Sequence, residues 1–191
     1  MAARSAVFLD RDGVINRDSE LFIRSVEEFQ PLPGSLDAIR RLKQAGWAVV
    51  VCTNQSGVGR GLYSLATLDS IHAHLRGLLA EQGTALDGIY ACPHLPEAGC
   101  ACRKPRPGML LQAAEELDLD LGNSFMVGDA ARDLEAGIAA GTRPVLVCTG
   151  KGEETLDAGT MPDVPVFDTL KDFAEWLLAG GMSDQGHSIT Q

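Results

Sequence analysis

The chain is 191 residues long, and 45% of these residues are hydrophobic and 22% are charged. This length is enough for one α/β domain with its own core, and it excludes two ordinary domains joined by a linker. With 16 Lys and Arg residues against 26 Asp and Glu residues the formal net charge is −10, which argues against a nucleic-acid partner because affinity for phosphate backbones comes from clustered Lys and Arg.

Short apolar runs alternate with longer segments of helical period along the chain. The runs that predict strands are 6–9, 47–52, 88–92, 125–127, 144–148 and 164–167, and the segments that predict helices are 35–45, 65–80, 108–117, 134–140 and 170–178. Because residues 48–51 are all apolar, the sheet should be buried on both faces and mainly parallel. We therefore expect one three-layer, Rossmann-like α/β domain over residues 1–180, followed by a disordered tail at 181–191.

No apolar run approaches the roughly 20 residues that cross a bilayer. The run at 6–9 is also too short for a signal-peptide core. We expect a soluble, cytoplasmic, monomeric protein with no membrane partner.

Two long loops interrupt the alternation, at 15–32 and at 93–107. Loops of this length inside a compact domain are usually functional. Each follows the carboxyl end of a predicted strand, so both should lie at the same edge of the sheet. Neither is long enough for a large cap domain, and the two loops should therefore determine which substrate is accepted.

Reactive side chains follow four of the predicted strands. They are Asp10 and Asp12, Thr53 and Asn54, Arg103 and Lys104, and Asp129. In open α/β sheets ligands bind at the carboxyl ends of the strands. The recurrence of such residues at four strand ends predicts a single site there.

Asp10 and Asp12 are two residues apart on extended chain, so their side chains can project to the same side. One carboxylate can stay ionised, bind a hard cation and attack phosphorus, while the other, held nearer to protonated, serves as general acid and then as general base. Gly13 would let the backbone turn sharply beside the phosphate. A pair of solvated loop aspartates, or a helix cap, is the alternative.

Asp129 adds a third carboxylate, which suits Mg²⁺, a cation that takes few protein oxygens. Asp133, one helical turn later, could hold a metal-bound water or orient Lys104. For both residues, capping of the following helix is the alternative. Thr53 and Lys104 could supply the positioning and charge neutralisation that phosphoryl transfer requires.

Three of the five cysteines cluster around a histidine. Cys92, His94, Cys100 and Cys102 form a complete tetrahedral set for a structural zinc ion. Buried free thiols with a surface histidine are the alternative. We expect Cys52 and Cys148 to be core residues, and His72 and His74 to be solvated on their helix.

The order Asp-x-Asp, Thr, Lys, Gly-Asp-x-x-x-Asp resembles the haloacid-dehalogenase-like superfamily of phosphatases over about residues 5–150. The strings 10–16, 53–57 and 102–109 are similar to the D-glycero-D-manno-heptose 1,7-bisphosphate 7-phosphatases, with the histidinol-phosphate phosphatases close by. That family also has a similar zinc site, in some members with a longer stretch between the residues matching His94 and Cys100.

The resemblance implies a role for each matching residue. Asp10 would be the nucleophile, Asp12 the acid/base whose backbone carbonyl also reaches Mg²⁺, and Asp129 the remaining protein ligand of the metal. Thr53 and Lys104 would hold the transferring phosphoryl group. The residues implied in substrate binding are Arg11, Asp18, Ser19, Glu20, Leu21, Asn54, Gln55, Ser56 and Arg103.

The function implied is Mg²⁺-dependent removal of the 7-phosphate of the heptose bisphosphate, in biosynthesis of lipopolysaccharide and nucleotide-heptose precursors. Histidinol-phosphate phosphatase activity is the alternative that shares every catalytic residue. A receiver-like signalling domain that stores phosphate on an aspartate is disfavoured because Asp12 is placed to release the phosphoryl group and because a receiver needs no zinc loop.

Overall fold

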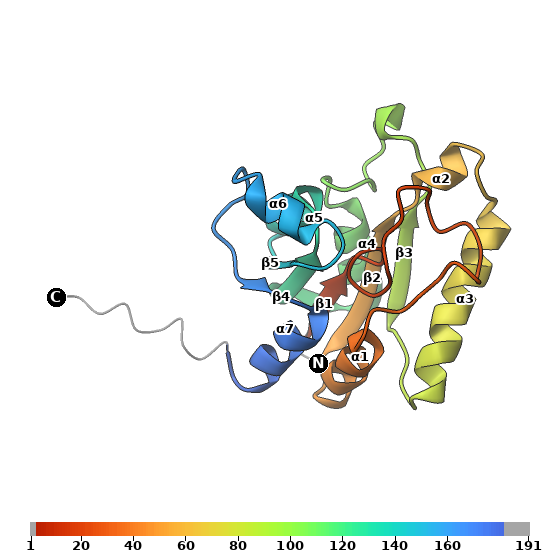
Figure 1. Cartoon of the computed structure of the whole chain (residues 1–191). Helices are drawn as coiled ribbons and strands as arrows, with labels where there is room; N and C mark the ends of the chain where they lie inside the picture. The colour runs from red at the N-terminus through yellow and green to blue at the C-terminus, as the bar shows by residue number, and fades with distance from the viewer. Residues whose placement is uncertain (1–2, 182–191) are drawn as a thin grey trace.

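Six strands form one central sheet, in the order β3-β2-β1-β4-β5-β6 (Figure 1). The structure is a computed structural model that describes residues 3–181, so the tail expected at 181–191 lies outside the described residues except for Gly181. Every pair of neighbouring strands is parallel. The strands are β1 Arg4–Leu9, β2 Ala48–Asn54, β3 Gly88–Cys92, β4 Leu119–Gly128, β5 Arg143–Val147 and β6 Val166–Phe167.

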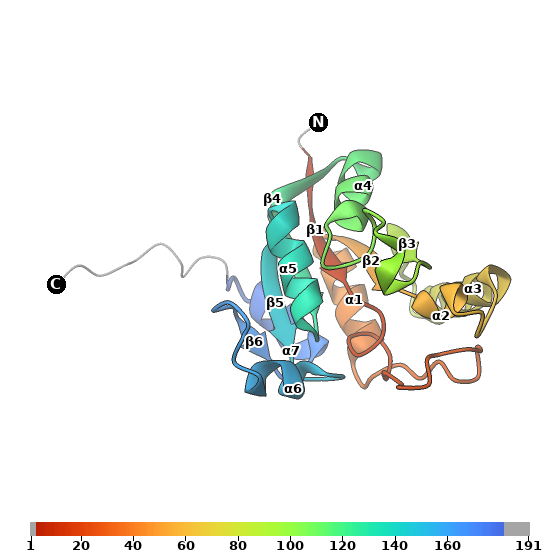
Figure 2. The same cartoon turned by 90° about the horizontal axis from the view of Figure 1, so that it is seen from above.

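Helices cover both faces of the sheet, as the view from above in Figure 2 also shows. One face packs against α1 Ser35–Gln44, α3 Leu65–Glu81 and α7 Leu170–Leu178. The other packs against α4 Gly108–Leu117 and α5 Ala131–Ala140. The predicted three-layer α/β fold is confirmed. No helix in the described part of the chain is both long enough and apolar enough to cross a membrane.

Alternating side chains of β1 enter the two cores. Val7 and Leu9 join the core under α1, α3 and α7, whereas Ala6 and Phe8 join the core under α4 and α5. All four are completely buried. A large aliphatic or aromatic side chain stabilises the fold by about 1.5–3 kcal/mol when fully buried. This two-sided burial explains the uninterrupted apolar run and fixes the end of β1, where Asp10 follows.

Sequence periodicity located most elements but missed the shortest helices. The bounds predicted for β3, α4 and α7 agree with the structure. β4 begins well before the predicted residue 125, because its first part, with Asp120, Gly122 and Asn123, lacks the apolar pattern of a buried strand. Three short helices were not predicted because they are too short to show a period: α2 Ser56–Gly59, α6 Gly152–Asp157 and the 3₁₀ helix Pro96–Ala98.

The two long loops lie at the carboxyl edge of the sheet, as expected. The ends of the first loop are held together, because Leu32 N donates to Ile15 O at 2.8 Å and Arg17 N donates to Gln30 O at 2.9 Å. The second loop contacts α2, since Gly59 N donates to Pro93 O at 3.0 Å. Both loops therefore begin beside the strand ends that present the polar residues.

Candidate active site

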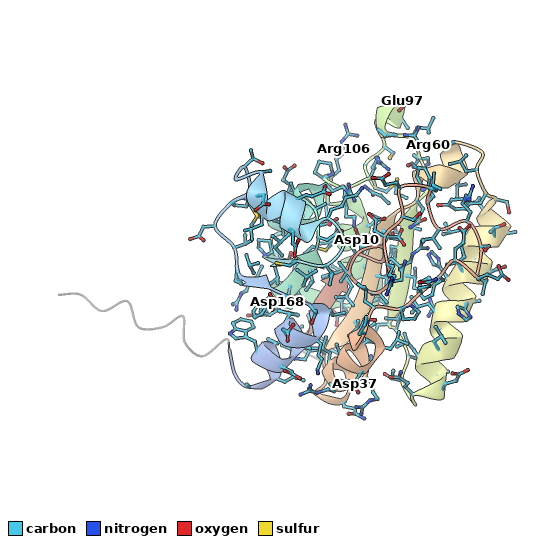
Figure 3. The ribbon with its side chains drawn as sticks, viewed as in Figure 1. Asp10, Asp37, Arg60, Glu97, Arg106 and Asp168 are labelled. Carbon is cyan, nitrogen blue, oxygen red and sulfur yellow. The ribbon has the colours of Figure 1, made fainter. Side chains whose placement is uncertain are left out.

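Asp10 lies at the centre of the site, directly after β1. Figure 3 shows it in the middle of the molecule, with Arg106 on the loop above it in the view. Its side chain is almost completely buried. Its backbone N donates to Val127 O of β4 at 3.0 Å, and its Oδ1 accepts from Arg11 N at 2.7 Å. The sheet thus fixes the position of this carboxylate.

Lys104 is a buried cation with a full set of partners. Its Nζ lies 3.0 Å from Asp10 Oδ1 and 2.8 Å from Asp133 Oδ1, and donates to Cys52 O at 2.7 Å. Burial alone would lower the pKa of Lys104, but Asp10 and Asp133 outweigh it and raise that pKa. An ammonium group has three donors, and all three are used here. Lys104 is therefore charged and fixed in direction.

Asn54 holds the backbone of Lys104. Its Nδ2 donates to Lys104 O at 3.0 Å, and its Oδ1 accepts from Lys104 N at 3.1 Å. Asn54 was predicted to bind substrate; in the structure its amide oxygen and one of its two N–H donors pair with the backbone of Lys104. The geometry assigns it the positioning of Lys104.

Asp133 both caps the following helix and contacts Lys104, two roles that were considered from the sequence. Its Oδ2 accepts from Ala130 N at 3.1 Å, which caps α5, and its Oδ1 pairs with Lys104. Gly128 is required here, because a Cβ at that position would lie 2.1 Å from Asp133 Cβ. The Asp133 carboxylate therefore caps α5 with Oδ2 and orients Lys104 with Oδ1.

The carboxylate of Asp129 packs closely against the backbone at Gly13 and Gly150. A Cβ on Gly13 would lie 2.1 Å from Asp129 Oδ2, and one on Gly150 would lie 2.2 Å from the same atom. Asp129 Oδ2 accepts from Lys151 N at 2.8 Å, while its buried Oδ1 has no hydrogen-bond partner among the described residues. A buried carboxylate oxygen without a donor is costly unless a ligand completes it.

Three carboxylates face one another here. Asp10, Asp129 and Asp133 each offer an oxygen within 4.8 Å of the others. Burial raises the pKa of Asp10 to about 6, and the negative charges of Asp133 and Asp12 act in the same direction. The positive charges of Lys104 and Arg132 oppose this rise without cancelling it. Burial and the charges of Asp10 and Asp133 raise the pKa of Asp129 to about 8. The unpaired Asp129 Oδ1 and this mutual repulsion fit a hard divalent cation such as Mg²⁺.

Asp12 is not part of that group; its side chain is held by donors. Oδ1 accepts from Arg11 Nε at 3.0 Å, Arg11 Nη2 at 2.9 Å and Asn16 Nδ2 at 2.9 Å, and Oδ2 accepts from Gln55 Nε2 at 2.9 Å. Burial alone would raise the pKa of Asp12, but the charge of Arg11 and the hydrogen bonds from Asn16 and Gln55 outweigh burial and lower that pKa. The expectation that Asp12 is held nearer to protonated than Asp10 is therefore wrong in this conformation, because the sequence did not show Arg11 folding back onto it.

Thr53 is the last residue but one of β2, close to these residues, and is buried. Its Oγ1 accepts from Gln55 Nε2 at 2.9 Å, and Tyr63 OH donates to Gln55 Oε1 at 2.6 Å. Gln55 therefore links Thr53 to Asp12. Ser56 follows as the first residue of α2 and is largely buried.

The other residues predicted to contact substrate divide into three places. Asp18, Ser19 and Leu21 line a hollow of about 300 Å³ in the first long loop, and Glu20 is exposed beside them. Arg103 and Lys104 line a second hollow of about 440 Å³. The Arg11 side chain is completely buried and paired with Asp12, so only its backbone could contact a substrate.

Arg132 is a site residue that sequence reasoning missed. It lines the second hollow, and its buried Nε has no hydrogen-bond partner among residues 3–181. Burial alone would lower the pKa of Arg132, but the negative charges of Asp133, Asp10 and Asp129 outweigh burial and raise that pKa. The sequence could have indicated it, since Arg132 immediately precedes Asp133 in the segment that follows β4.

The cysteine cluster has the geometry of a metal site. Cys92 Sγ lies 3.5 Å from His94 Nδ1 and 3.6 Å from Cys100 Sγ, and Cys102 Sγ lies 3.3 Å from His94 Nδ1. Zinc bonds of about 2.0–2.3 Å in a tetrahedron place neighbouring ligand atoms about 3.3–3.8 Å apart. His94 is exposed, as in the alternative reading, but the four side chains converge on one point and Cys100 and Cys102 are only half-buried, so separate buried thiols do not describe this loop.

The predictions for the remaining cysteines and histidines were partly wrong. Cys52 is completely buried, as expected, but Cys148 is half-buried because it follows the end of β5. His72 is buried rather than solvated because its ring lies beside Arg11. His74 is half-buried and packs edge-on against Phe29, with ring centroids 5.9 Å apart.

Comparisons with known proteins point to one family. The model of the HAD-hydrolase-like family matches residues 101–173. A D-glycero-beta-D-manno-heptose-1,7-bisphosphate 7-phosphatase from Pseudomonas putida is 53% identical over 90% of this chain and 98% of its own length, and one from Pseudomonas aeruginosa is 51% identical over 92% and 99%. The chain belongs to this phosphatase family. A crystal structure of D,D-heptose 1.7-bisphosphate phosphatase from B. bronchiseptica, complexed with magnesium and phosphate, has a TM-score of 0.89 and 49% identity, and the match covers 92% of this chain and 99% of that one.

Proposed function

We propose that this chain is a Mg²⁺-dependent phosphohydrolase that removes the 7-phosphate of D-glycero-β-D-manno-heptose 1,7-bisphosphate through an aspartyl-phosphate on Asp10. One observation supports it above all: a buried carboxylate fixed by Lys104 lies within 4.8 Å of the carboxylate of Asp129, one oxygen of which has no hydrogen-bond partner among the described residues. The relatives support the substrate, since those at about half identity are named for this reaction. In this role the chain supplies precursors for lipopolysaccharide.

The reaction runs in two steps on this chain's own residues. Asp10 attacks phosphorus, an O–P bond forms, and the bond from phosphorus to the sugar oxygen breaks as Asp12 gives that oxygen a proton. Asp12 then takes a proton from water that attacks the aspartyl-phosphate, and inorganic phosphate leaves. Lys104 and Thr53 hold the transferring phosphoryl group.

Mg²⁺ would be held by Asp10, Asp129 and the backbone carbonyl of Asp12. When bound, it would neutralise the carboxylates and the phosphoryl oxygens. Asp12 must carry a proton to begin the first step, so it must leave at least some of the donors that hold it in the resting structure. The donors Arg11, Asn16 and Gln55 therefore influence how readily Asp12 can act as the acid.

We expect magnesium to stabilise the protein more as the pH rises. A carboxyl group whose pKa is raised in the folded chain stabilises the fold at low pH, and this stabilisation is lost as the pH rises through that pKa. For Asp10 and Asp129 the loss begins above the ordinary pKa of 3.8 and is complete once the pH has passed about 6 and about 8, respectively. Thermal unfolding across this range should show a Tm that falls without magnesium and is restored by it. Asp129→Asn should reduce the restoration, and a magnesium effect independent of pH would contradict the assignment.

We propose that Cys92, His94, Cys100 and Cys102 hold a structural zinc ion. The ion would fold a loop without a core of its own beside Arg103 and Lys104. Removing zinc should lower the Tm and raise KM, while phosphate transfer to Asp10 remains measurable. Cys148→Ser, outside the cluster, should leave the zinc content unchanged. Unchanged Tm and activity after complete zinc removal would refute the idea.

A substrate with two phosphates fits the cations of the second hollow. Arg103, Arg106 and Arg132 line it together with Lys104, in a chain whose net charge is −10. Lys104 would bind the phosphate that is transferred, and Arg103 and Arg132 the one that stays. Arg132→Met should raise KM about tenfold or more for a bisphosphate, since a charge-assisted contact contributes about 1.5–3 kcal/mol, and much less for a monophosphate. Arg40→Met on α1 is the control, and equal effects on both substrates would contradict this role.

Turnover assays decide between the two phosphatase activities. Purified protein with Mg²⁺ is given the β-anomer of the heptose bisphosphate, its α-anomer and histidinol phosphate in parallel. We expect the highest kcat/KM with the β-anomer. Preference for histidinol phosphate would support the alternative enzyme, and a single turnover without further hydrolysis would support a receiver-like domain.

A further inference from the structure

Arg11 has an unusual environment for a cation, because its side chain is completely buried next to the active site. Nε and Nη2 contact Asp12, the closest approach being 2.9 Å. Nη1 lies 3.1 Å from Nε2 of His72. His72 belongs to α3, far from Arg11 in sequence. The guanidinium is thus held from two sides, by the proposed acid/base and by a helix.

The contact with Arg11 fixes the state of His72. Arginine has donors only and does not lose its proton in proteins, so His72 Nε2 must accept and its ring proton must be on Nδ1. Burial and the neighbouring Arg11 lower the pKa of His72 to about 4. A neutral histidine is therefore the acceptor that the buried Nη1 requires.

We infer that His72 is a positioning residue for Asp12, acting through Arg11. The inference rests on the proposed acid/base role of Asp12. When Asp12 turns toward the leaving oxygen it must loosen its contacts with Arg11, Asn16 and Gln55. Arg11 would then be a buried cation without its carboxylate, and only the fixed acceptor on α3 keeps it in place. Arg11 can then direct Asp12 in both steps.

A purely space-filling role would not need a histidine. The neighbouring positions Leu68, Ile71 and Leu75 on α3 are buried and apolar, so an apolar side chain would fit the same helix face. The imidazole costs desolvation at this place. Within residues 3–181 the hydrogen bond that its ring makes is the one accepted from Arg11, which points to a role in the site rather than in the core.

His72→Phe tests the inference, because phenylalanine keeps the ring and removes the acceptor. We expect kcat/KM for a sugar phosphate to fall about 10–100-fold, as small misplacements of catalytic groups do, with little change in magnesium affinity. For an aryl phosphate with a good leaving group, which needs no proton in the first step, kcat/KM should change little. His72→Gln, which offers an amide oxygen as acceptor, should recover most of the loss.

The controls separate this inference from the proposed function. His74→Phe, on the same helix, should leave both substrates unaffected. Asp12→Asn should show the same dependence on the leaving group as His72→Phe; if it does not, the role of Asp12 fails and the inference with it. If Asp12→Asn shows the dependence and His72→Phe does not, or if Gln is no better than Phe, the inference alone is overturned. Should His72→Phe fail to fold, His72→Asn, too short to reach Arg11, takes its place.

Discussion

Asp10→Asn should abolish turnover, with kcat lowered on the order of 10⁴-fold or more, because the amide cannot form the phosphoryl-enzyme intermediate. The substitution preserves the shape of a side chain that is nearly completely buried. Lys104 keeps two of its three partners, Asp133 and the carbonyl of Cys52. The fold should therefore survive the loss of activity. Asparagine also removes a carboxylate that burial makes costly to ionise, so the Tm without magnesium should not fall.

The measurement combines steady-state turnover with trapping of labelled phosphate on the protein. Wild-type protein quenched in acid during turnover should carry label at Asp10, and Asp10→Asn should carry none. Asp37→Asn, an aspartate on α1 paired with Arg40, is the matched control and should keep full activity. Retained turnover in Asp10→Asn, or label at another residue, would show that the nucleophile is wrongly assigned.

The layers of the fold could be predicted because a strand that is buried on both faces has a continuous apolar sequence. Apolar runs at 48–51 and 144–148 predict strands in the interior of the sheet, and the helices of nine or more residues show their period. The polar residues at the strand ends could be grouped for the same reason, because parallel strands direct their carboxyl ends to one edge. In the structure Asp10 lies next to both Lys104 and Asp129.

The side chains that fold back could not be predicted in this way. Arg11 turns onto Asp12, and His72 approaches it from α3, a contact between residues 61 positions apart. Neither contact has a periodic signal, because each depends on how helix and loop pack in three dimensions. The pairing of Asn54 with Lys104 was hidden for the same reason, whereas the prediction that Asn54 contacts substrate followed from the family resemblance. Sequence order located the site, but the packing determines which residues position the others.

Lys104→Met should reduce both stability and activity, because it leaves two buried carboxylates without their cation. Removing one partner of a buried ion pair costs about 3–5 kcal/mol, and here Asp10 and Asp133 both lose the same partner. The loss should grow as the pH rises, since the unpaired carboxyl groups stabilise the fold only while protonated. Denaturant unfolding at several pH values measures this. Lys171→Met, on an exposed pair with Glu175, should change stability by at most about 1 kcal/mol.

A double variant separates the two effects of Lys104. Lys104→Met with Asp133→Asn removes one of the unpaired carboxylates, so part of the stability should return. Turnover should not return, because the charge that holds the transferring phosphoryl group is still missing and loss of one such donor costs on the order of 10²–10³-fold in kcat. If the double variant regained activity together with stability, Lys104 would act only as a structural partner of Asp10 and Asp133. If stability returned without activity, the same ammonium group would both neutralise the resting site and bind the phosphate that Asp10 receives.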